Sequence, residues 1–280
     1  MSRSGEHAKI YELVKASEKL FNYEMDLDAE ELASLKKEAE AFLPSHGIIA
    51  HLVLARVACL NNDLDAMRQH HAVILEMSPD DPAGYRDYSD SLRKLGYYSE
   101  AREMARRAYE LHPNDGELLR LLLKSCVISG LFQASWRYLD LVIKSNARIM
   151  TREYNFLTAA VQFFRETDIS DAELERLQQI TLAVLRLEEL VPIGALRSPA
   201  VHMELLHAAP DPTGMNTSSP QQFLMWGIQT SVQGDRLGML NERLCQTISR
   251  SQLTQQILTH VKIRFFHRTR DGMLSTGFNF

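Results

Sequence analysis

The chain has 280 residues, of which 45% are hydrophobic and 24% charged, and its formal net charge is −5. This composition is that of a globular protein, and it excludes a collagen-like chain, a mostly disordered chain and a disulfide-stapled mini-protein. The acidic balance argues against nucleic-acid binding over the whole surface and leaves a local basic patch open.

The N-terminal segment has no apolar run of signal-peptide length behind a basic region. No stretch approaches the run of about 18 apolar residues that a membrane helix needs. The three cysteines, Cys59, Cys126 and Cys245, have no CxxC spacing and predict neither a disulfide framework nor a zinc cluster. We therefore expect a cytoplasmic protein without membrane contact, cofactor or metal.

Two amphipathic helices are predicted at the start of the chain, over residues 8–22 and 28–42. Ile10, Leu13 and Leu20 recur at helical spacing in the first, and Leu32 and Leu35 do so in the second. Because stacked repeats need a terminal cover, we expect the two helices to form a degenerate leading repeat that caps a helical array.

A period of 34 residues runs through segments 48–81, 82–115 and 116–149. Pro79 and Pro113 are one period apart, and so are Gly96 and Gly130. Asn62 replaces glycine in the first segment, and asparagine is the next best residue for the positive φ with which helices often end. The pattern predicts three stacked helix pairs.

The middle segment resembles the tetratricopeptide repeat (TPR) family. Seven residues of this segment match that family's pattern at repeat positions 4, 8, 11, 15, 20, 27 and 32: Tyr85, Ser89, Leu92, Gly96, Ala101, Ala108 and Pro113. The resemblance implies a mainly α fold, in which antiparallel helix pairs form an α-solenoid that binds protein partners in its concave groove.

By that resemblance, repeat positions 2, 5, 9, 12 and 13 face the groove, where basic residues outnumber acidic ones. We expect a protein or peptide partner with an apolar anchor and with carboxylates or phosphates. A solvated, charged helix surface is the alternative. The candidate groove residues are Leu52, Arg56, Leu60, Arg86, Arg93, Lys94, Arg120 and Lys124.

One function known in the family is excluded if this register is right. Co-chaperones that bind the C-terminal carboxylates of heat-shock chaperones need Lys and Asn at set positions of the first helices. Here those positions hold Leu52, Arg56, Asp87, Glu117 and Leu121. The carboxylate clamp is therefore absent.

Two more helices, Tyr154–Phe164 and Asp171–Leu190, are predicted to extend or cap the array. Pro192, Gly194 and Pro199 then break the helical pattern. We therefore expect a helical repeat domain over residues 1–190 and a separate module over residues 196–280.

The C-terminal module is predicted to be a small α+β unit, in which we recognise no family. We expect a strand at Val201–Ala208 and a helix that begins at Ser219-Pro220 and ends before Gly234. Further helix follows over Arg236–Leu258. A β-hairpin should join His260–His267 to Met273–Phe280 through the turn dipeptide Asp271-Gly272.

Four histidines on the expected strands are a weak candidate for chemistry. If strand 201–208 pairs with 260–267, His202 could converge with His260 or His267 on a metal or act with it as acid and base, and His207 lies on the same strand. Ordinary strand histidines are the alternative. No nucleophile elbow, phosphate loop or dinucleotide motif is present. We name no catalytic residue, and an enzyme with a site in this module remains an alternative.

The tail carries a basic cluster of Lys262, Arg264, Arg268 and Arg270, interleaved with phenylalanines. Such a hairpin could contact the phosphates of a nucleic acid. Charges that protect an edge strand from aggregation are the alternative. The function expected first is a cytoplasmic scaffold or adaptor with an assembly, chaperone-like or regulatory role. A regulator that binds nucleic acid through this hairpin is expected second.

Overall fold

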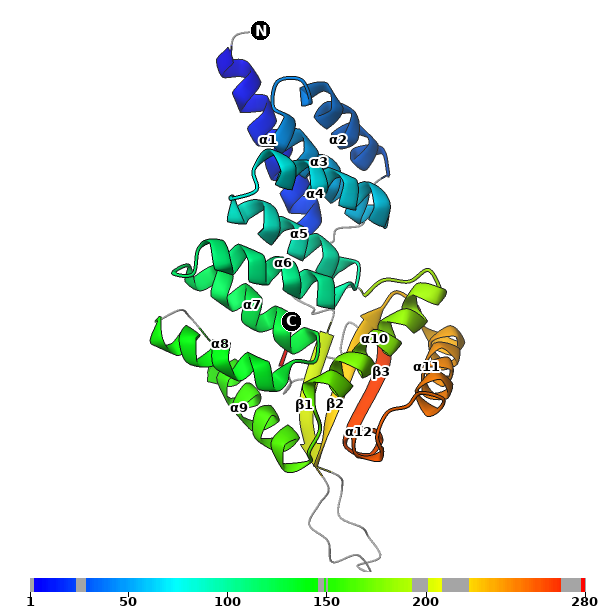
Figure 1. Ribbon diagram of the computed structural model, residues 1–280. Coiled ribbons are helices and arrows are strands. Elements are labelled where there is room, and N and C mark those ends of the chain that lie inside the picture. Colours follow the sequence, from blue (N-terminus) through cyan, green and yellow to red (C-terminus); the bar gives the residue numbers. More distant parts are fainter. Residues whose placement is uncertain are drawn as a thin grey trace, which may run out of the picture. The chain divides into compact units, whose positions relative to one another are not determined.

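The computed structural model describes residues 3–23, 29–145, 149, 151–192, 201–207, 222–267 and 278–279. Over these residues the chain forms two compact units, divided between Pro113 and Asn114 (Figure 1). Within the described helices, none has the length and hydrophobicity to span a bilayer.

Among the described residues, the first unit consists of six helices. Helix α3 packs against α4 and α5 against α6, while α1 packs on both α2 and α3. The helices expected at residues 8–22 and 28–42 are confirmed as α1 and α2. The bounds are α1 Arg3–Tyr23, α2 Ala29–Phe42, α3 Gly47–Leu60, α4 Leu64–Met77, α5 Pro82–Lys94 and α6 Tyr98–Leu111.

The turns within the helix pairs confirm the 34-residue period. Asn62, Gly96 and Gly130 all have positive φ, at 58°, 77° and 90°. An aspartate then caps a following helix, as when the Asp81 carboxylate accepts a hydrogen bond of 2.9 Å from the backbone N–H of Ala83. The Asp115 carboxylate likewise accepts a hydrogen bond of 2.8 Å from the backbone N–H of Glu117. The repeat thus recurs as backbone conformation and as capping chemistry.

The second unit combines the remaining helices with a sheet. Its strand order is β3-β2-β1-β4, with β1 antiparallel to β2 and to β4, and β2 parallel to β3. The helices are α7 Gly116–Ile128, α8 Phe132–Lys144, α9 Thr151–Glu166, α10 Asp171–Leu187, α11 Gly234–Ser249 and α12 Gln255–His260. The strands are β1 Val201–His207, β2 Gln222–Thr230, β3 Val261–His267 and β4 Phe278–Asn279.

The helix predicted to run from Ser219-Pro220 to Val232 is wrong, because residues 222–230 form strand β2. From Trp226 to Thr230 every residue of this strand is buried. A short apolar run buried on both faces fits a central strand as well as a helix, so its periodicity does not distinguish the two. Gly234, expected to end that helix, instead begins α11, with a φ of 58°.

The hairpin predicted at the C-terminus is also wrong in its pairing. The strand at 260–267 exists as β3, but it pairs in parallel with β2, so that Leu224 lies opposite Val261. The last strand, β4, pairs with β1 instead, with Met203 opposite Phe278. The proposed turn at Asp271-Gly272 lies outside the described residues.

An aromatic core joins the sheet of the second unit to its helices. The ring of Phe132 in α8 lies 4.9 Å from that of Phe164 in α9 and 6.5 Å, edge-on, from that of Trp226 in β2. All three side chains are fully buried. Large buried rings contribute strongly to core stability, so β2 helps to hold α8 and α9 in place. Separate folding of residues 1–190 and 196–280 stays a prediction.

Candidate partner-binding surfaces

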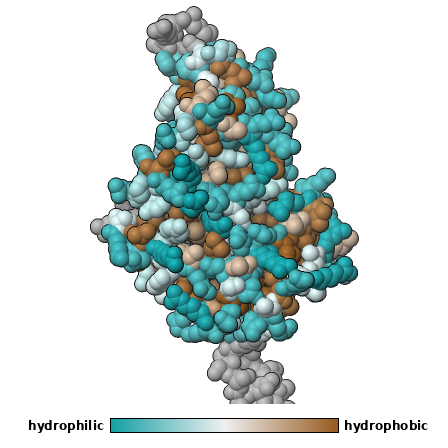
Figure 2. All heavy atoms as spheres, in the orientation of Figure 1, coloured by the Kyte–Doolittle hydropathy of each residue, from teal (hydrophilic) through white to brown (hydrophobic). Residues whose placement is uncertain are grey.

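Hydrophobic residues on the face drawn in Figure 2 form small patches among hydrophilic ones. Scattered apolar residues are normal on a protein surface. A partner-binding surface is therefore expected where a pocket coincides with the residues predicted from the repeat. These residues fall in both units, with Arg120 and Lys124 in the second and the rest in the first.

Arg56 of α3 is buried, with only 9% of its surface exposed. Its Nη1 donates a hydrogen bond of 3.2 Å to the hydroxyl of Ser17 in α1. Its Nη2 lies 3.9 Å from Oδ2 of Asp87 in α5. Burial raises the pKa of the Asp87 carboxyl above its ordinary value, while the charge of Arg56 opposes that rise. The guanidinium thus joins three helices of the first unit.

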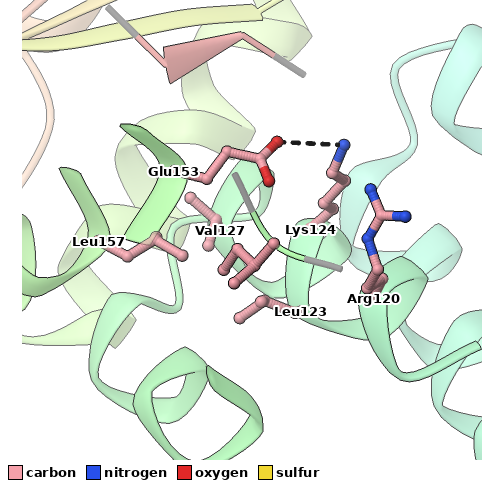
Figure 3. Close-up of a pocket in the computed structure, with 7 residues that line it drawn as sticks. Arg120, Leu123, Lys124, Val127, Glu153 and Leu157 are labelled. Carbon is pink, nitrogen blue, oxygen red and sulfur yellow. Dashed lines mark ion pairs between the residues drawn. The ribbon is translucent and has the colours of Figure 1, made fainter. Parts of the chain in front are cut away.

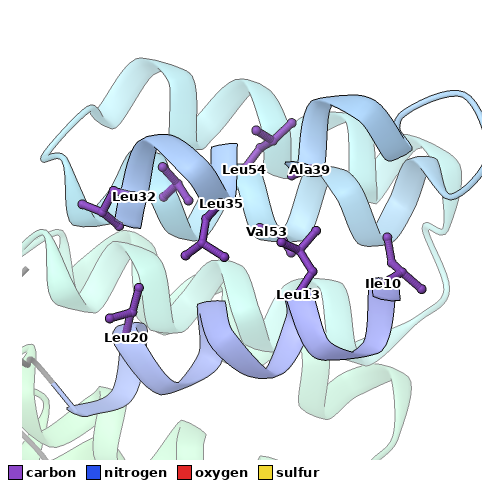
Figure 4. Close-up of a cluster of buried hydrophobic side chains, with 9 residues drawn as sticks. Ile10, Leu13, Leu20, Leu32, Leu35, Ala39, Val53 and Leu54 are labelled. Atoms are coloured by element: carbon purple, nitrogen blue, oxygen red, sulfur yellow. The ribbon is translucent and has the colours of Figure 1, made fainter. Parts of the chain in front are cut away.

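Helix α1 covers part of the predicted surface of the first unit. The ring of Phe21 lies 5.9 Å from the guanidinium carbon of Arg56 and 4.9 Å from Nζ of Lys94. Leu60 packs, partly buried, against the apolar cluster that α1 forms with α2 and α3 (Figure 4). Figure 1 shows α1 passing α3 and ending close to α5.

Two predicted cations of the first unit are partly exposed to solvent. The side chain of Arg86 is 52% exposed and pairs with Asp87 at 3.5 Å. The side chain of Arg93 is 40% exposed and pairs with Asp90 at 2.8 Å. Ion pairs in water contribute only about 0–1 kcal/mol, so a partner's carboxylate could replace either one. Leu52 is half-buried.

The second unit contains a pocket beneath α7. Its empty volume is about 260 Å³ when open solvent is included, and its enclosed part has room for about one water molecule. Figure 3 shows Lys124 and Glu153 across from the apolar side chains of Leu123, Val127 and Leu157. The lining residues are Arg120, Leu123, Lys124 and Val127 of α7, Ile149, and Glu153 and Leu157 of α9.

The two cations of this pocket have different carboxylate partners. Nζ of Lys124 lies 3.5 Å from Oε1 of Glu153, whose side chain is 4% exposed. Nη1 of Arg120 lies 3.1 Å from Oε1 of Glu117, whose side chain is 79% exposed. A buried carboxylate is costly to leave without a counter-ion, whereas an exposed one is readily solvated. Arg120 is therefore the cation that can exchange its partner for a ligand anion.

Sequence reasoning missed the carboxylates that offset the basic residues. Glu153 lies beyond the last aligned repeat, so no register position pointed to it. Asp87 was visible at position 6 of the second repeat, and its contact with Arg56 follows from the packing of α5 on α3. The excess of positive charge predicted for the groove is therefore reduced in both units.

The strand histidines do not converge as predicted, because β2 lies between β1 and β3. Nε2 of His202 lies 3.8 Å from Oε2 of Glu204, which is on the same strand, β1. The Nδ1 atoms of His260 and His267 each contact a backbone oxygen of β2, at 3.4 Å and 3.3 Å. Within the described ranges no three His, Cys, Asp or Glu side chains could hold one metal ion. The side chain of His207 lies outside those ranges.

The basic cluster of the tail is described only in part. Lys262 and Arg264 are exposed on β3, and Nζ of Lys262 donates to the backbone oxygen of Leu258 at 2.9 Å. Arg268 and Arg270 lie outside the described residues. Contact of this cluster with a polyanion stays a prediction.

Comparison with known proteins gives a match to a protein family. Residues 82–125 match the family profile described as tetratricopeptide repeat. They include α5, α6 and most of α7, with the positive-φ Gly96 between the paired helices α5 and α6. No curated protein matches the chain.

Proposed function

Since the chain carries tetratricopeptide repeats, which are protein-interaction modules, we propose that it is a cytoplasmic scaffold or adaptor that holds a peptide segment of a partner protein at the pocket beneath α7. One observation carries this proposal. Arg120 and Lys124, selected from the repeat register alone, line a pocket together with apolar side chains of α7 and α9. Pockets with an apolar lining and a few polar groups are the usual form of binding sites.

The chemistry of the pocket defines the peptide. An apolar side chain of the peptide packs over the mouth of the pocket, on the side of Leu123, Val127 and Leu157. A carboxylate or phosphate next to it takes the place of Glu117 on the guanidinium of Arg120. Hydrogen bonds to charged groups contribute about 1.5–3 kcal/mol, so this contact is worth roughly a tenfold to hundredfold change in affinity. Lys124 stays with Glu153 and closes the side of the pocket.

Selection of a random peptide library on the intact chain tests this function. We expect the enriched peptides to share an apolar residue followed closely by an acidic one. Fluorescence anisotropy then compares their affinity for the wild type, for Arg120→Glu and for the matched control Arg236→Glu, which changes an exposed arginine of α11. Affinity should fall at least tenfold for Arg120→Glu alone.

Two results would overturn the proposal. One is a consensus without acidic residues, which would remove the role of Arg120. The other is equal binding to the wild type and to Arg120→Glu after circular dichroism has shown equal helix content. The assembly, chaperone-like or regulatory role then follows from the protein that contains the selected peptide.

A further inference from the structure

Two histidine rings of the first unit meet between α3 and α4. Nδ1 of His51 in α3 lies 3.0 Å from Nδ1 of His70 in α4. The ring centroids are 5.2 Å apart, and the ring planes are inclined by 45°. Among the residues that the structure describes, each of the two rings has the other as its hydrogen-bond partner. Both residues are half-buried, so the pair is accessible from solvent.

Nδ1 atoms that face each other can be joined in two ways. If one of them carries a proton, the two rings share a neutral N–H···N hydrogen bond. If both rings carry their proton on Nε2 instead, two lone pairs point into one space, and a cation between them satisfies both. Imidazole nitrogens bind Zn²⁺ at about 2.0–2.1 Å, so two nitrogens that share one ion lie roughly 2.8–3.4 Å apart. The distance of 3.0 Å between the two Nδ1 atoms falls in that range.

The surroundings of His70 suit a metal ligand. Burial, and next the charge of His51, lowers the pKa of His70 below its ordinary value, so this ring is neutral at pH 7, the form that binds a metal. Three ionised side chains also act on the ring. Asp63 and Glu40 contribute two negative charges there, against one positive charge from Lys36. All three residues are exposed, and their sum favours a cation.

We propose that His51 and His70 form a two-histidine site for a divalent transition-metal ion, copper or zinc, on the surface between α3 and α4. Water molecules complete the coordination, since no group of three His, Cys, Asp or Glu side chains in the described ranges could hold one ion. When the ion binds, the proton shared by the Nδ1 atoms moves to Nε2 of its own ring, and both rings stay neutral. The ion then joins the two helices of one repeat. Mg²⁺ and Ca²⁺ do not suit the site, because they prefer oxygen ligands.

The sequence does not indicate this site. His51 and His70 are 19 residues apart on different helices, unlike the histidine pairs at i and i+4 that bind zinc from a single helix. Their contact follows from the packing of α3 on α4. The proposal therefore replaces the expectation of a chain without metal. Because the site lies in the first unit, it is independent of the pocket beneath α7.

Cu²⁺ alone is the first probe, added to the full-length chain without an affinity tag, because it binds nitrogen ligands most tightly among these divalent ions. Isothermal titration calorimetry should show one tight site per chain. Loss of one ligand, in His51→Gln or in His70→Gln, should weaken binding at least tenfold. Equal Cu²⁺ affinity of the wild type and both single variants, with equal helix content by circular dichroism, would overturn the site.

A second pair of neighbouring histidine rings in the same unit provides the matched control. The ring centroids of His7 and His46 are also 5.2 Å apart, but Nδ1 of His46 lies 3.0 Å from the hydroxyl oxygen of Ser45 instead of facing the other ring. The double variant His7→Gln, His46→Gln should therefore bind Cu²⁺ as tightly as the wild type does. A loss in this variant as large as in His51→Gln would contradict the assignment.

Thermal unfolding tests zinc. A ligand that binds the folded chain raises the unfolding midpoint, so excess Zn²⁺ should raise that of the wild type and leave those of His51→Gln and His70→Gln unchanged. The same concentration of Mg²⁺ should not change the wild-type midpoint. A shift with Zn²⁺ that persists in both variants would place the ion elsewhere and overturn the site. Tight Cu²⁺ binding at the pair without a Zn²⁺ shift would assign the site to copper.

Measurements on the wild type alone cover the case in which the variants do not fold. Electron paramagnetic resonance of the chain with one equivalent of Cu²⁺ should show hyperfine coupling to two imidazole nitrogens. The paramagnetic ion should also broaden amide NMR signals most strongly around His51 and His70. Coupling to a single imidazole, or broadening centred on another part of the chain, would overturn the site.

Discussion

The side-chain amide of Asn241 in α11 bonds to both backbone groups of Phe265 in β3. Oδ1 accepts a hydrogen bond of 2.8 Å from the N–H, and Nδ2 donates one of 3.1 Å to the carbonyl oxygen. In a strand these two groups point to the same side, and β2 occupies the opposite edge of β3. Asn241 therefore stands where a further strand would pair, and it covers an edge that would otherwise be open to aggregation.

Replacing Asn241 by leucine should destabilise the second unit by about 1–3 kcal/mol, because two backbone groups lose their partners. Hydrogen exchange at the Phe265 amide should become faster. Denaturant titration and exchange mass spectrometry measure the two effects. Gln246→Leu, on an exposed position of the same helix, is the control and should change stability by less than about 0.5 kcal/mol. Equal effects would show that the edge contact contributes nothing.

Gly130 should not tolerate alanine. It has a φ of 90°, and a Cβ atom there would lie 2.7 Å from the backbone of Leu174 and of Glu175 in α10. Backbone strain and the clash together should cost roughly 3 kcal/mol. The matched control is Gly238→Ala in α11, where a Cβ atom meets nothing within 4 Å. That substitution should stabilise the chain by about 0.5–1 kcal/mol. Thermal unfolding would give opposite shifts for the two variants.

Asp171, the first residue of α10, should matter for the stability of the neighbouring helix α8. Its two carboxylate oxygens accept hydrogen bonds from the backbone N–H groups of Gln133 at 2.8 Å and Ala134 at 2.9 Å, so it caps α8. Loss of such a cap in Asp171→Ala should cost about 1–2 kcal/mol. Asp140→Ala removes only an exposed bond to Lys144 and should cost at most about 0.5 kcal/mol. Similar losses in denaturant titrations of the two variants would argue against the cap.

The protein should lose stability as the pH is lowered, because of His71. Burial, and next the charge of Arg56, lowers its pKa from 6.5 to about 3. Below pH 6.5, the His71 side chain therefore binds a proton in the unfolded chain and stays neutral in the folded chain. The contribution of His71 is complete above pH 6.5 and is lost progressively as pH falls towards 3, with about 2 kcal/mol lost at pH 5.

Unfolding at pH 7 and at pH 5 tests the role of His71. The variant His71→Gln should lose about 2 kcal/mol less than wild type between the two values. His112→Gln, on an exposed position, should lose as much as wild type. If His71→Gln lost as much stability between pH 7 and pH 5 as wild type does, the pH dependence would arise from other groups.

Of the three cysteines, one should react with thiol reagents in the folded protein. Cys245 is exposed, whereas Cys59 and Cys126 are buried. Burial also raises the pKa of the Cys59 thiol to about 12, so it carries no thiolate at neutral pH. Titration with a chromogenic disulfide should count one thiol in the native chain, three after denaturation and none in native Cys245→Ser. A second fast thiol in the native chain would contradict the described packing.

The repeated helix pairs could be predicted from the sequence because their signals are local. A residue able to adopt positive φ, a capping aspartate and small residues at helix crossings recur in every period or nearly so. Gly96 and Gly130 were identified in this way, and Asn62 was predicted as their equivalent, which its φ of 58° confirms.

The other features of the fold and of the candidate site depend on contacts between residues that are far apart in the sequence. The parallel pairing of β2 with β3 brings Trp226 opposite Ile263, and no turn signal encodes it. The Ser219-Pro220 dipeptide favoured a helix, whereas pairing with β1 and β3 makes residues 222–230 a central strand. The candidate site was predicted through Arg120 and Lys124. Glu153 and the contact of Phe21 with Lys94 follow from packing that the repeat pattern does not specify.

The contact between Phe132 and Trp226 bears on how the chain matures during synthesis. Helices α8 and α9 leave the ribosome well before β2. Until Trp226 arrives, the rings of Phe132 and Phe164 lack part of their cover and are a ready binding site for chaperones. The first unit is complete in sequence before that point, so it should fold while the second unit still lacks its sheet. A premature stop after Leu190 would leave that aromatic surface permanently exposed and would mark the product for degradation.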